Sequence, residues 1–463
     1  MSAWRGRLAQ VVPDPILRRA IGAVDKAQLP AFRGPASELR DRGAARLAEA
    51  LAAYPAESAT ETLLGEAWHV VRQEPGTGED RLVGHLRRSG LAVVADAGVH
   101  RPPGTVASFR VADPALHGRR GALSNALAAP LALVGERPPV PAKDILAVDF
   151  PVDAVYTWVD GSDPRWLETR RAAAGARAAG LPPTSNDDAR FASHDELRYS
   201  LRSLEYFAPW IRHVHLVTAG QVPDWLDTSA PGITVVDHGE IFADPSHLPT
   251  FNSHAIEANL HRISGLTEQF LYLNDDVFLG RGVGPETFFT PGGAARIFPS
   301  RQRIQGGTGA LPVDTAAANN RAVLLDRFQR TASFKFKHTV HAQVRSTLED
   351  IDRDYPELVA ATSAARFRSD SDLSIPSSLA HYYGVGTGRA VVSSVDYRYV
   401  DLDDPRAQLL LARLLWNAPP EMFCLNQVRS VRDGQARGAM LANFLGSFFP
   451  FPSRFEKAVG TRG

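Results

Sequence analysis

Three consecutive polar residues, Asn274, Asp275 and Asp276, offer the clearest chemistry in this sequence because they directly follow the apolar run 270–273. Their carboxylate and amide oxygens are hard ligands that suit Mg²⁺ or Mn²⁺. A bridging cation of this kind neutralises the charge of a nucleotide diphosphate. The alternative is a turn in which Asp and Asn cap the next element. The motif alone leaves both interpretations open.

Two histidines three residues apart, His338 and His341, form a second candidate. On a helix they would share a face. His338 is then a candidate general base or nucleophile for phosphoryl transfer. A zinc site would need a third ligand, and no nearby residue has convincing spacing. The alternative is that both rings pack or form hydrogen bonds at the start of a helix.

Arginine and glycine supply weaker signals. Arg368 suits a bidentate clamp on phosphate oxygens, although an isolated arginine beside a helix is usually solvated. The run 305–309 is rich in glycine but lacks the Gly-Lys-Ser/Thr of a phosphate-binding loop, so we expect a plain loop. Trp158 and three other tryptophans are candidates for stacking on a base or sugar, but they are more typical of a core.

The elements that would position these residues alternate between strand and helix. Short apolar runs predict strands at 152–159, 214–218, 233–237 and 270–273, with helices at 165–179, 196–207 and 253–263. Ser193 and Glu196 fit a capping box before the second helix, and Ser253 can cap the third. This order predicts an α/β fold with a mostly parallel, doubly wound sheet. Asp160-Gly161 and the 274–276 cluster both fall at strand ends, where such sheets bind ligands.

The whole sequence divides into three parts, and the second of them contains these strands and helices. Residues 1–148 suggest a separate α+β region of unknown role, and 149–435 the catalytic domain. After about 315 the chain looks mainly helical, with helices expected near 315–330, 340–353, 371–383 and 405–416. Residues 436–463 form a carboxy-terminal tail whose aromatic segment 444–451 should dock on the core.

Bulk composition restricts the function classes. The 463 residues carry 51 basic and 51 acidic side chains, so nothing argues for nucleic-acid binding. One cysteine, Cys424, excludes an internal disulfide. The beginning of the chain lacks the apolar core of a signal peptide, and no run of about 18 apolar residues occurs. We therefore expect a soluble, cytoplasmic protein without a transmembrane segment, while a peripheral contact with a membrane stays open.

The middle of the chain resembles the Stealth family, from about residue 150 to about 430. This family contains bacterial capsule and exopolysaccharide phosphotransferases. It also contains the catalytic subunit of the animal enzyme that places N-acetylglucosamine-1-phosphate on lysosomal glycoproteins. The matching blocks are Asp153–Asp163, Arg190–Phe191, Glu196–Ser203, Ala208–His213, Gln221–Leu226, Leu248–Ser253, Leu271–Asp276, Lys337–His338, Arg366–Arg368 and Phe423–Asn426.

The resemblance implies a Rossmann-like catalytic domain similar to that of GT-A glycosyltransferases. It implies transfer of hexose-1-phosphate, often N-acetylhexosamine-1-phosphate, from a UDP-sugar to a glycan hydroxyl, with release of UMP and a requirement for Mg²⁺ or Mn²⁺. The residues that it points to are catalytic His338, Arg368 and Asp276, metal-binding Asn274, Asp275, Asp276 and Asn426, and nucleotide-binding Tyr156, Thr157, Trp158, Asp160, Gly161, Glu196 and Arg198.

One position departs from the family pattern. The last block usually reads Leu-Asn-Asp, whereas here it reads Leu425-Asn426-Gln427. Glutamine can offer an oxygen to a hard cation but brings no charge. Two alternatives therefore stay open beside the phosphotransferase. One is a conventional glycosyltransferase that releases UDP, and the other is a non-catalytic protein that binds a UDP-sugar or carbohydrate in a polysaccharide assembly complex.

Overall fold

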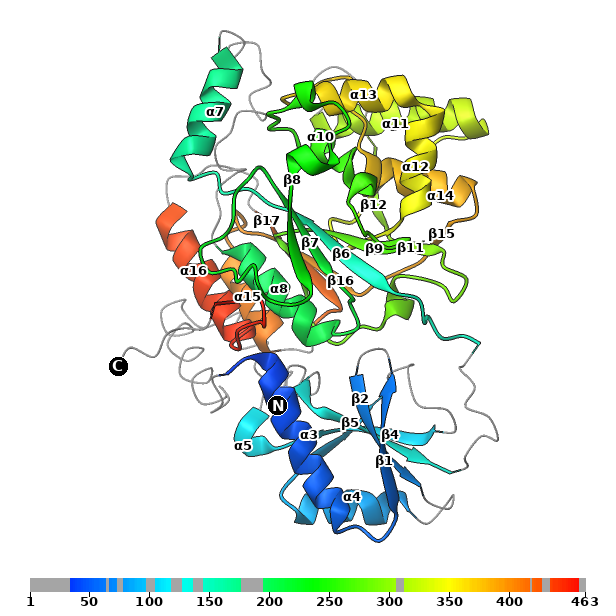
Figure 1. Ribbon diagram of the computed structural model, residues 1–463, viewed down its shortest axis with the longest axis vertical. Coiled ribbons are helices and arrows are strands. Elements are labelled where there is room, and N and C mark those ends of the chain that lie inside the picture. The colour runs from blue at the N-terminus through cyan, green and yellow to red at the C-terminus, as the bar shows by residue number, and fades with distance from the viewer. Residues whose placement is uncertain are drawn as a thin grey trace.

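The computed structural model describes residues 34–63, 66–72, 78–96, 105–117, 127–135, 145–175, 195–304, 312–416, 419–426 and 434–457. These residues form an amino-terminal α+β unit and a larger α/β unit (Figure 1). Ser193 of the expected capping box, the glycine-rich run 305–309 and Gln427 lie outside the described residues.

The amino-terminal unit is a sheet with the strand order β1-β2-β5-β4-β3, covered by helices on one face (Figure 1). Strands β2 and β5 are parallel, and the other neighbouring pairs are antiparallel. Leu47 and Leu51 of α3 pack with Leu82 and Leu86 of α4 on the sheet. The elements are β1 (Glu57–Leu63), β2 (Glu66–Arg72), β3 (Ala92–Ala95), β4 (Thr105–Ala112), β5 (Ala129–Val134), α3 (Ala36–Ala52), α4 (Glu79–Arg88) and α5 (Pro114–His117).

The larger unit is built on a second sheet with the order β14-β9-β6-β7-β8. Neighbouring strands from β9 to β8 are parallel, whereas β14 pairs antiparallel with β9 at one edge. Its strands are β6 (Val152–Thr157), β7 (Val214–Thr218), β8 (Ile233–Asp237), β9 (Gln269–Asn274) and β14 (His341–Val344). All residues of β7 and β14 are buried, as expected for strands covered on both faces. The α/β class with a mostly parallel sheet is confirmed.

Two hydrophobic cores lie on the two faces of this sheet, and β6 contributes side chains to both cores. Ala154 and Tyr156 point into a core with α8, whereas Val155 between them packs in a core with α10 to α14. The helices around the sheet are α7 (Pro164–Ala174), α8 (Glu196–Phe207), α9 (His238–Ile241), α10 (Ser253–Glu257), α11 (Pro312–Phe328), α12 (Arg345–Asp354), α13 (Pro356–Ala364), α14 (Ala380–Gly386), α15 (Ala407–Trp416) and α16 (Gly434–Phe448). Single turns of other helical types occur at 245–247, 260–262, 285–287 and 375–379.

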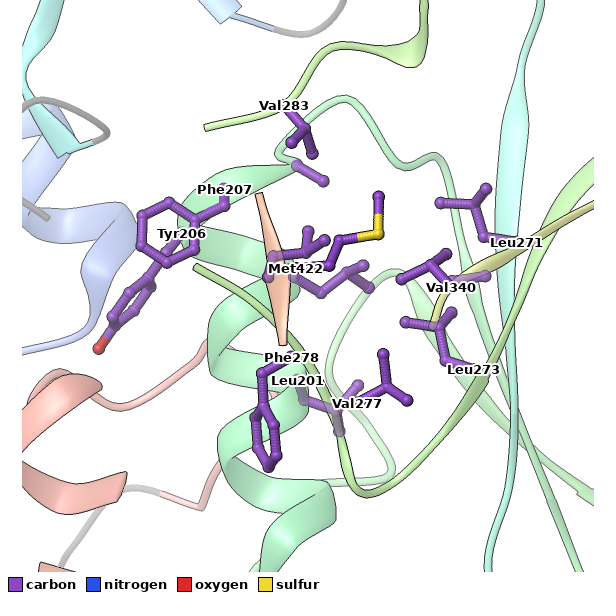
Figure 2. Close-up of a cluster of buried hydrophobic side chains, with 14 of the residues drawn as sticks. Leu201, Tyr206, Phe207, Leu271, Leu273, Val277, Phe278, Val283, Val340 and Met422 are labelled. Carbon is purple, nitrogen blue, oxygen red and sulfur yellow. The ribbon is translucent and has the colours of Figure 1, made fainter. Parts of the chain in front are cut away.

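A small sheet with the order β10-β17-β16 packs on the α8 side. Strand β17 runs antiparallel to β10 and parallel to β16. Figure 2 shows Val277 and Phe278 of β10 and Met422 of β17 packed against Leu201 and Phe207 of α8. The remaining strands are β10 (Val277–Leu279), β16 (Tyr397–Asp401), β17 (Met422–Asn426), the parallel pair β11 (Ala295–Ile297) and β15 (Ala390–Val392), and the antiparallel pair β12 (Pro299–Arg303) and β13 (Phe334–Phe336).

The structure corrects three expectations about local structure. The segment 340–353 begins as strand β14 and becomes helix only at Arg345, because its first residues complete the sheet edge beside β9. The helix expected at 253–263 is α10, which is capped by Asn252 rather than Ser253. It ends at Glu257, well before 263. The segment 371–383 becomes helical only from Ile375, through a π-type turn that leads into α14.

The carboxy-terminal segment docks on the core, as expected from its aromatic residues. Phe444, Phe449 and Phe451 are buried in the core that contains α8. The amide of Ala36 donates to the carbonyl oxygen of Pro452 at 3.2 Å, so this segment also contacts the amino-terminal unit. None of the described helices has the length and apolar content needed to span a bilayer.

Candidate active site

The acidic turn lies between the two sheets of the larger unit. Asn274 ends β9, and Asp275 and Asp276 lead directly into β10. Because Thr157 pairs with Asn274 in the parallel β6–β9 register, the segment after β6 leaves the sheet at the same edge. From the other side, the amide of Leu425 in β17 donates to the carbonyl oxygen of Asp276 at 3.0 Å. Backbone pairing on both sides therefore fixes the turn.

Asp276 is the centre of a polar cluster. Nε2 of His338 lies 3.1 Å from Oδ1 and 3.2 Å from Oδ2 of Asp276. Asn426 donates to Oδ2 through Nδ2 at 3.1 Å, and the thiol of Cys424 donates to the same oxygen at 3.3 Å. The backbone of His338 is held by the hydroxyl of Tyr397, which donates to its carbonyl oxygen at 2.5 Å. The structure thus brings together Asp276, His338 and Asn426.

His338 and Asp276 form an ion pair that shifts both pKa values. Burial alone would lower the pKa of His338, but the charge and hydrogen bonds of Asp276 outweigh it and raise the pKa above its usual value. Burial would raise the pKa of Asp276, but His338 and the donors Cys424 and Asn426 lower it. About a third of the His338 side chain (34%) is exposed, so its ring is accessible to a ligand.

Asp275 has other acidic side chains as neighbours. Burial raises its pKa well above the usual value, and the neighbouring carboxylates of Glu196 and Asp276 raise it further. Glu196 begins α8 and is itself buried. Carboxylates that lie near one another repel unless they share a proton or bind a cation. These oxygen donors fit a divalent metal ion.

The ligand atoms of Asp276, His338 and Cys424 lie within 4.8 Å of one another and could also hold a metal ion. This second set offers one oxygen, one nitrogen and one sulfur, which is softer than the oxygen set of Asp275 and Glu196. Both sets share the acidic turn, so the donors present fit a cation between the two sheets.

A hydrogen-bonded path extends from this turn to a buried acid that the sequence reasoning missed. The hydroxyl of Tyr272 lies 3.0 Å from Oε1 of Glu257 and 3.1 Å from Oδ1 of Asn274. Nδ2 of Asn274 lies 3.5 Å from Nε2 of His338. Since the phenol has one proton, at any moment it can donate to only one of Glu257, Asn274 and Thr157. Glu257 could have been found as the acid inside the apolar stretch Ala255–Ala258.

Arg368 lies near Glu257 and Tyr272, at the far end of this path. Its guanidinium donates to Oγ of Ser253 at 2.9 Å, and its buried Nε has no hydrogen-bond partner among the described residues. Burial lowers the pKa of Arg368, and the nearby carboxylates of Glu257 and Asp372 counteract that shift. A buried donor without a partner is costly, which fits an arginine that awaits an anion.

Asp372, also missed by the sequence reasoning, fixes the Arg368 loop. Its Oδ2 accepts hydrogen bonds from Nδ2 of Asn252 at 2.9 Å and from the amide of Ser369 at 3.0 Å, and it lies 3.2 Å from Nδ1 of His254. This carboxylate therefore joins the start of α10 to the loop that carries Arg368. The signal was weak, because Asp372 resembles any other acid near a helix start.

The residues expected to bind the nucleotide occupy different environments. Gln221 clamps the loop after β6: its Oε1 accepts from the amide of Asp160, and its Nε2 donates to the carbonyl oxygen of Asp160, both at 3.0 Å. Gly161 and half-buried Trp158 belong to this loop. Thr157 lies at the sheet edge, with its hydroxyl 3.1 Å from that of Tyr272.

Two of the expected residues make structural contacts. Tyr156 is fully buried, and its hydroxyl lies 2.9 Å from Oγ of Ser200. Arg198 donates to Glu456 of the carboxy-terminal segment at 2.5 Å and lies over the ring of Trp225.

His341 does not share a face with His338, so the expected pairing on a helix is wrong. It lies in β14, and its Nδ1 is 2.9 Å from Nε2 of buried His381. Burial lowers the pKa of His341 well below its usual value, and that of His381 to about 3. Both rings are therefore neutral core groups, and it is His338 that contacts Asp276.

Four conserved regions of Stealth proteins match this chain: region 1 at residues 150–178, region 2 at 190–297, region 3 at 337–384 and region 4 at 412–463. The chain belongs to the Stealth family. In this Stealth protein, region 1 supplies the loop after β6, region 2 the acidic turn, region 3 His338 and Arg368, and region 4 Cys424 and Asn426.

Curated relatives carry a common name. An exopolysaccharide phosphotransferase of Streptomyces coelicolor is 51% identical over 314 residues, which are 67% of this chain and 53% of the relative. The exopolysaccharide phosphotransferase CpsY of Mycobacterium tuberculosis is 40% identical over 317 residues, which are 67% of this chain and 59% of the relative. This Stealth protein therefore spans somewhat more than half the length of the curated relatives it matches.

Solved structures offer only distant similarity. A galactosyltransferase, LgtC, in complex with donor and acceptor sugar analogs is 12% identical, covers 64% of this chain and 96% of its own, and has a TM-score of 0.31. Mouse xyloside xylosyltransferase 1 is 11% identical, covers 61% and 100% respectively, and has a TM-score of 0.28. We therefore describe the fold by the order and direction of the strands in its own sheet, and not by these solved structures.

Proposed function

We propose that this Stealth protein transfers a hexose-1-phosphate unit, N-acetylhexosamine-1-phosphate in the first instance, from a UDP-sugar to a hydroxyl of a glycan during exopolysaccharide or capsule synthesis. UMP is released and a phosphodiester joins the two sugars. The proposal is supported by membership of the Stealth family and by relatives named exopolysaccharide phosphotransferases.

The observation that carries the proposal is the grouping of acidic and cationic side chains around one site. Asp275 and Asp276 of the acidic turn lie near Glu196, His338 contacts Asp276, and Arg368 lies near Glu257, which Tyr272 links to Asn274. A diphosphate needs cationic groups around its oxygens, and phosphoryl transfer depends mainly on such positioning and charge stabilisation. Arg368, with its unpartnered Nε, would bind a non-bridging oxygen.

The donor set indicates where a divalent cation, Mg²⁺ or Mn²⁺, would bind. Asp276 and Asp275 would hold it with help from the oxygens of Asn274 or Asn426, and the bound cation would neutralise diphosphate charge. The raised pKa of Asp275 supports this assignment, because the carboxylates repel one another without a counter-charge. The loop of Thr157, Trp158, Asp160 and Gly161 would then receive the nucleotide at the same sheet edge.

His338 would act on the acceptor. As a base, it takes the proton of the attacking hydroxyl while that oxygen bonds to the β-phosphorus and the bond to the bridging oxygen of UMP breaks. As a nucleophile, its nitrogen would first bond to phosphorus with loss of UMP, and the acceptor oxygen would displace it in a second step. In both routes Asp276 orients the ring and stabilises its charged form.

Nucleotide product analysis tests this function. The purified protein would be incubated with UDP-N-acetylglucosamine and then UDP-glucose, with Mn²⁺ or Mg²⁺ and a bacterial glycan extract. We expect metal-dependent UMP release that is lost in Asp276→Ala and His338→Ala. His213→Ala is the matched control, because that half-exposed ring binds Thr234.

The other products separate the alternatives. Release of UDP instead of UMP would mean a conventional glycosyltransferase. Metal-dependent binding of every UDP-sugar without turnover would mean a non-catalytic protein, and a thermal shift with each donor would detect that binding.

A further inference from the structure

Strand β16 presents a face that the proposed reaction has not yet used. It is an edge strand of the small sheet, next to β17. Because side chains alternate along a strand, Tyr397, Tyr399 and Asp401 share one face, while Arg398 points to the other.

The face with the two tyrosines is directed toward the catalytic cluster. The hydroxyl of Tyr397 donates to the carbonyl oxygen of His338 at 2.5 Å. Tyr399 lies opposite Cys424 in the parallel register of β16 and β17, and the Cys424 thiol donates to Asp276. Partners in a parallel pair place their side chains on the same side of the sheet. Tyr399 therefore lies on the same side as the thiol that binds Asp276.

Tyr399 differs from its neighbours in exposure. It is 43% exposed, whereas Cys424 is fully buried and Tyr397 is half-buried. Burial of part of the ring, together with nearby Cys424 and Asp401, raises the pKa of Tyr399, so its hydroxyl stays neutral and can donate a hydrogen bond. A single exposed tyrosine is common on protein surfaces, but this ring combines an open apolar surface with a place beside the reactive groups.

The donor and the acceptor would contact different sheets. The nucleotide loop follows β6 in the large sheet, whereas β16 is the strand of the small sheet farthest from β10. The turn with Asp276 connects β9 of the large sheet to β10 of the small sheet. A donor bound at the large sheet would therefore leave the β16 side to the acceptor.

We propose that the exposed ring of Tyr399 is a stacking platform for a pyranose ring of the acceptor glycan, which it holds beside His338. This inference rests on the proposed function and names the acceptor subsite of the same site. The apolar faces of a pyranose pack on an aromatic ring, and the phenol can bind a sugar hydroxyl. Tyr399 is thus a specificity-determining residue that contacts the acceptor.

Saturation-transfer NMR tests the subsite without any turnover. The probes are cellotetraose, maltotetraose and chitotetraose, each added to the full chain. We expect at least one of them to receive saturation from the wild type. The signal should fall at least fivefold in Tyr399→Ala, persist in Tyr399→Phe, and be unchanged in Arg398→Ala, which alters the opposite face of the same strand. The inference is overturned if no probe binds the wild type, or if the Tyr399→Ala signal equals that of the wild type.

Kinetics supply a second readout. For the acceptor used in the UMP assay, Tyr399→Ala should raise the acceptor KM about fivefold to tenfold and change the donor KM less than twofold. An equal rise in both KM values would overturn an acceptor platform and indicate general damage to the site. Failure of the proposed function can be told apart from failure of this inference. Absence of UMP release would concern the donor reaction, whereas the NMR signal depends only on glycan binding.

Discussion

Nε2 of His338 lies 3.1 Å from Oδ1 of Asp276, although 62 residues separate the two along the chain. In the metal-free protein we expect the imidazole to titrate above 6.5, because the carboxylate outweighs the effect of burial on the pKa of His338. In Asp276→Asn this carboxylate charge is lost and burial remains, so the pKa of His338 should fall, although the charges of Glu257 and Asp275 still act on the ring. Histidine ring NMR signals, assigned with His338→Gln, would measure both values.

Because the pKa of His338 is raised in the folded protein, the stability of the fold should depend on pH. The His338–Asp276 pair should stabilise the fold fully between the pKa of unfolded Asp276 and that of unfolded His338. This contribution should disappear as the pH rises through the raised folded pKa of His338, or falls through the lowered folded pKa of Asp276. An unchanged His338 titration in Asp276→Asn would show that the pair does not set the charge of the ring.

A second prediction concerns metal binding at Asp275. Because the pKa of this carboxyl is raised well above its usual value, protons should compete with the cation, and Mn²⁺ affinity should fall as the pH is lowered. Asp275→Asn should weaken Mn²⁺ binding about tenfold at pH 8 and flatten its pH dependence. Calorimetric titration at pH 6 and pH 8 would measure this, with exposed Asp224→Asn as the control. Equal affinity in Asp275→Asn and Asp224→Asn would remove Asp275 from the metal site.

A third prediction addresses the path through Tyr272. Tyr272→Phe keeps the buried ring but removes the hydroxyl that lies between Glu257 and Asn274. We expect kcat to fall about three- to tenfold, which corresponds to the roughly 1 kcal/mol of a hydrogen bond, with little change in donor KM.

The matched control for Tyr272→Phe is Tyr206→Phe. This equally buried hydroxyl donates to the carbonyl oxygen of Phe451, away from the cluster. It should lower the melting temperature and leave kcat near that of the wild type. Equal kcat losses in both variants would mean that the Tyr272 hydroxyl has no special role.

A fourth prediction concerns the anchor of the carboxy-terminal segment. The Glu456 side chain is 1% exposed and pairs with Arg202, which is 8% exposed, at 2.6 Å. Glu456→Ala leaves a buried guanidinium without its partner and should reduce the free energy of unfolding by about 3 kcal/mol. Chemical denaturation would measure the loss. The control is Glu38→Ala, which breaks the exposed pair with Arg42 and should cost less than about 0.5 kcal/mol. Similar costs in both variants would contradict a structural role for the buried pair.

The sequence by itself determined the parallel sheet and the acidic turn. Continuous apolar runs such as Phe270–Leu273 favour buried strands when polar residues and predicted helices flank them at regular intervals. Asn274, Asp275 and Asp276 then had to lie at the carboxyl end of a strand. Family motifs added His338 and Arg368, which spacing alone did not separate from ordinary core or surface residues.

Only the tertiary structure decided which distant residues meet. His338 and His341 have the same type and nearly the same position, but antiparallel pairing of β14 with β9 buries His341 against His381 and leaves His338 beside Asp276. Tyr399 gave no local signal, and the acid Glu257 inside an apolar stretch gave only a weak one, because their environments depend on contacts across elements far apart in the chain. Local patterns fix the elements, whereas long-range packing of side chains fixes the site.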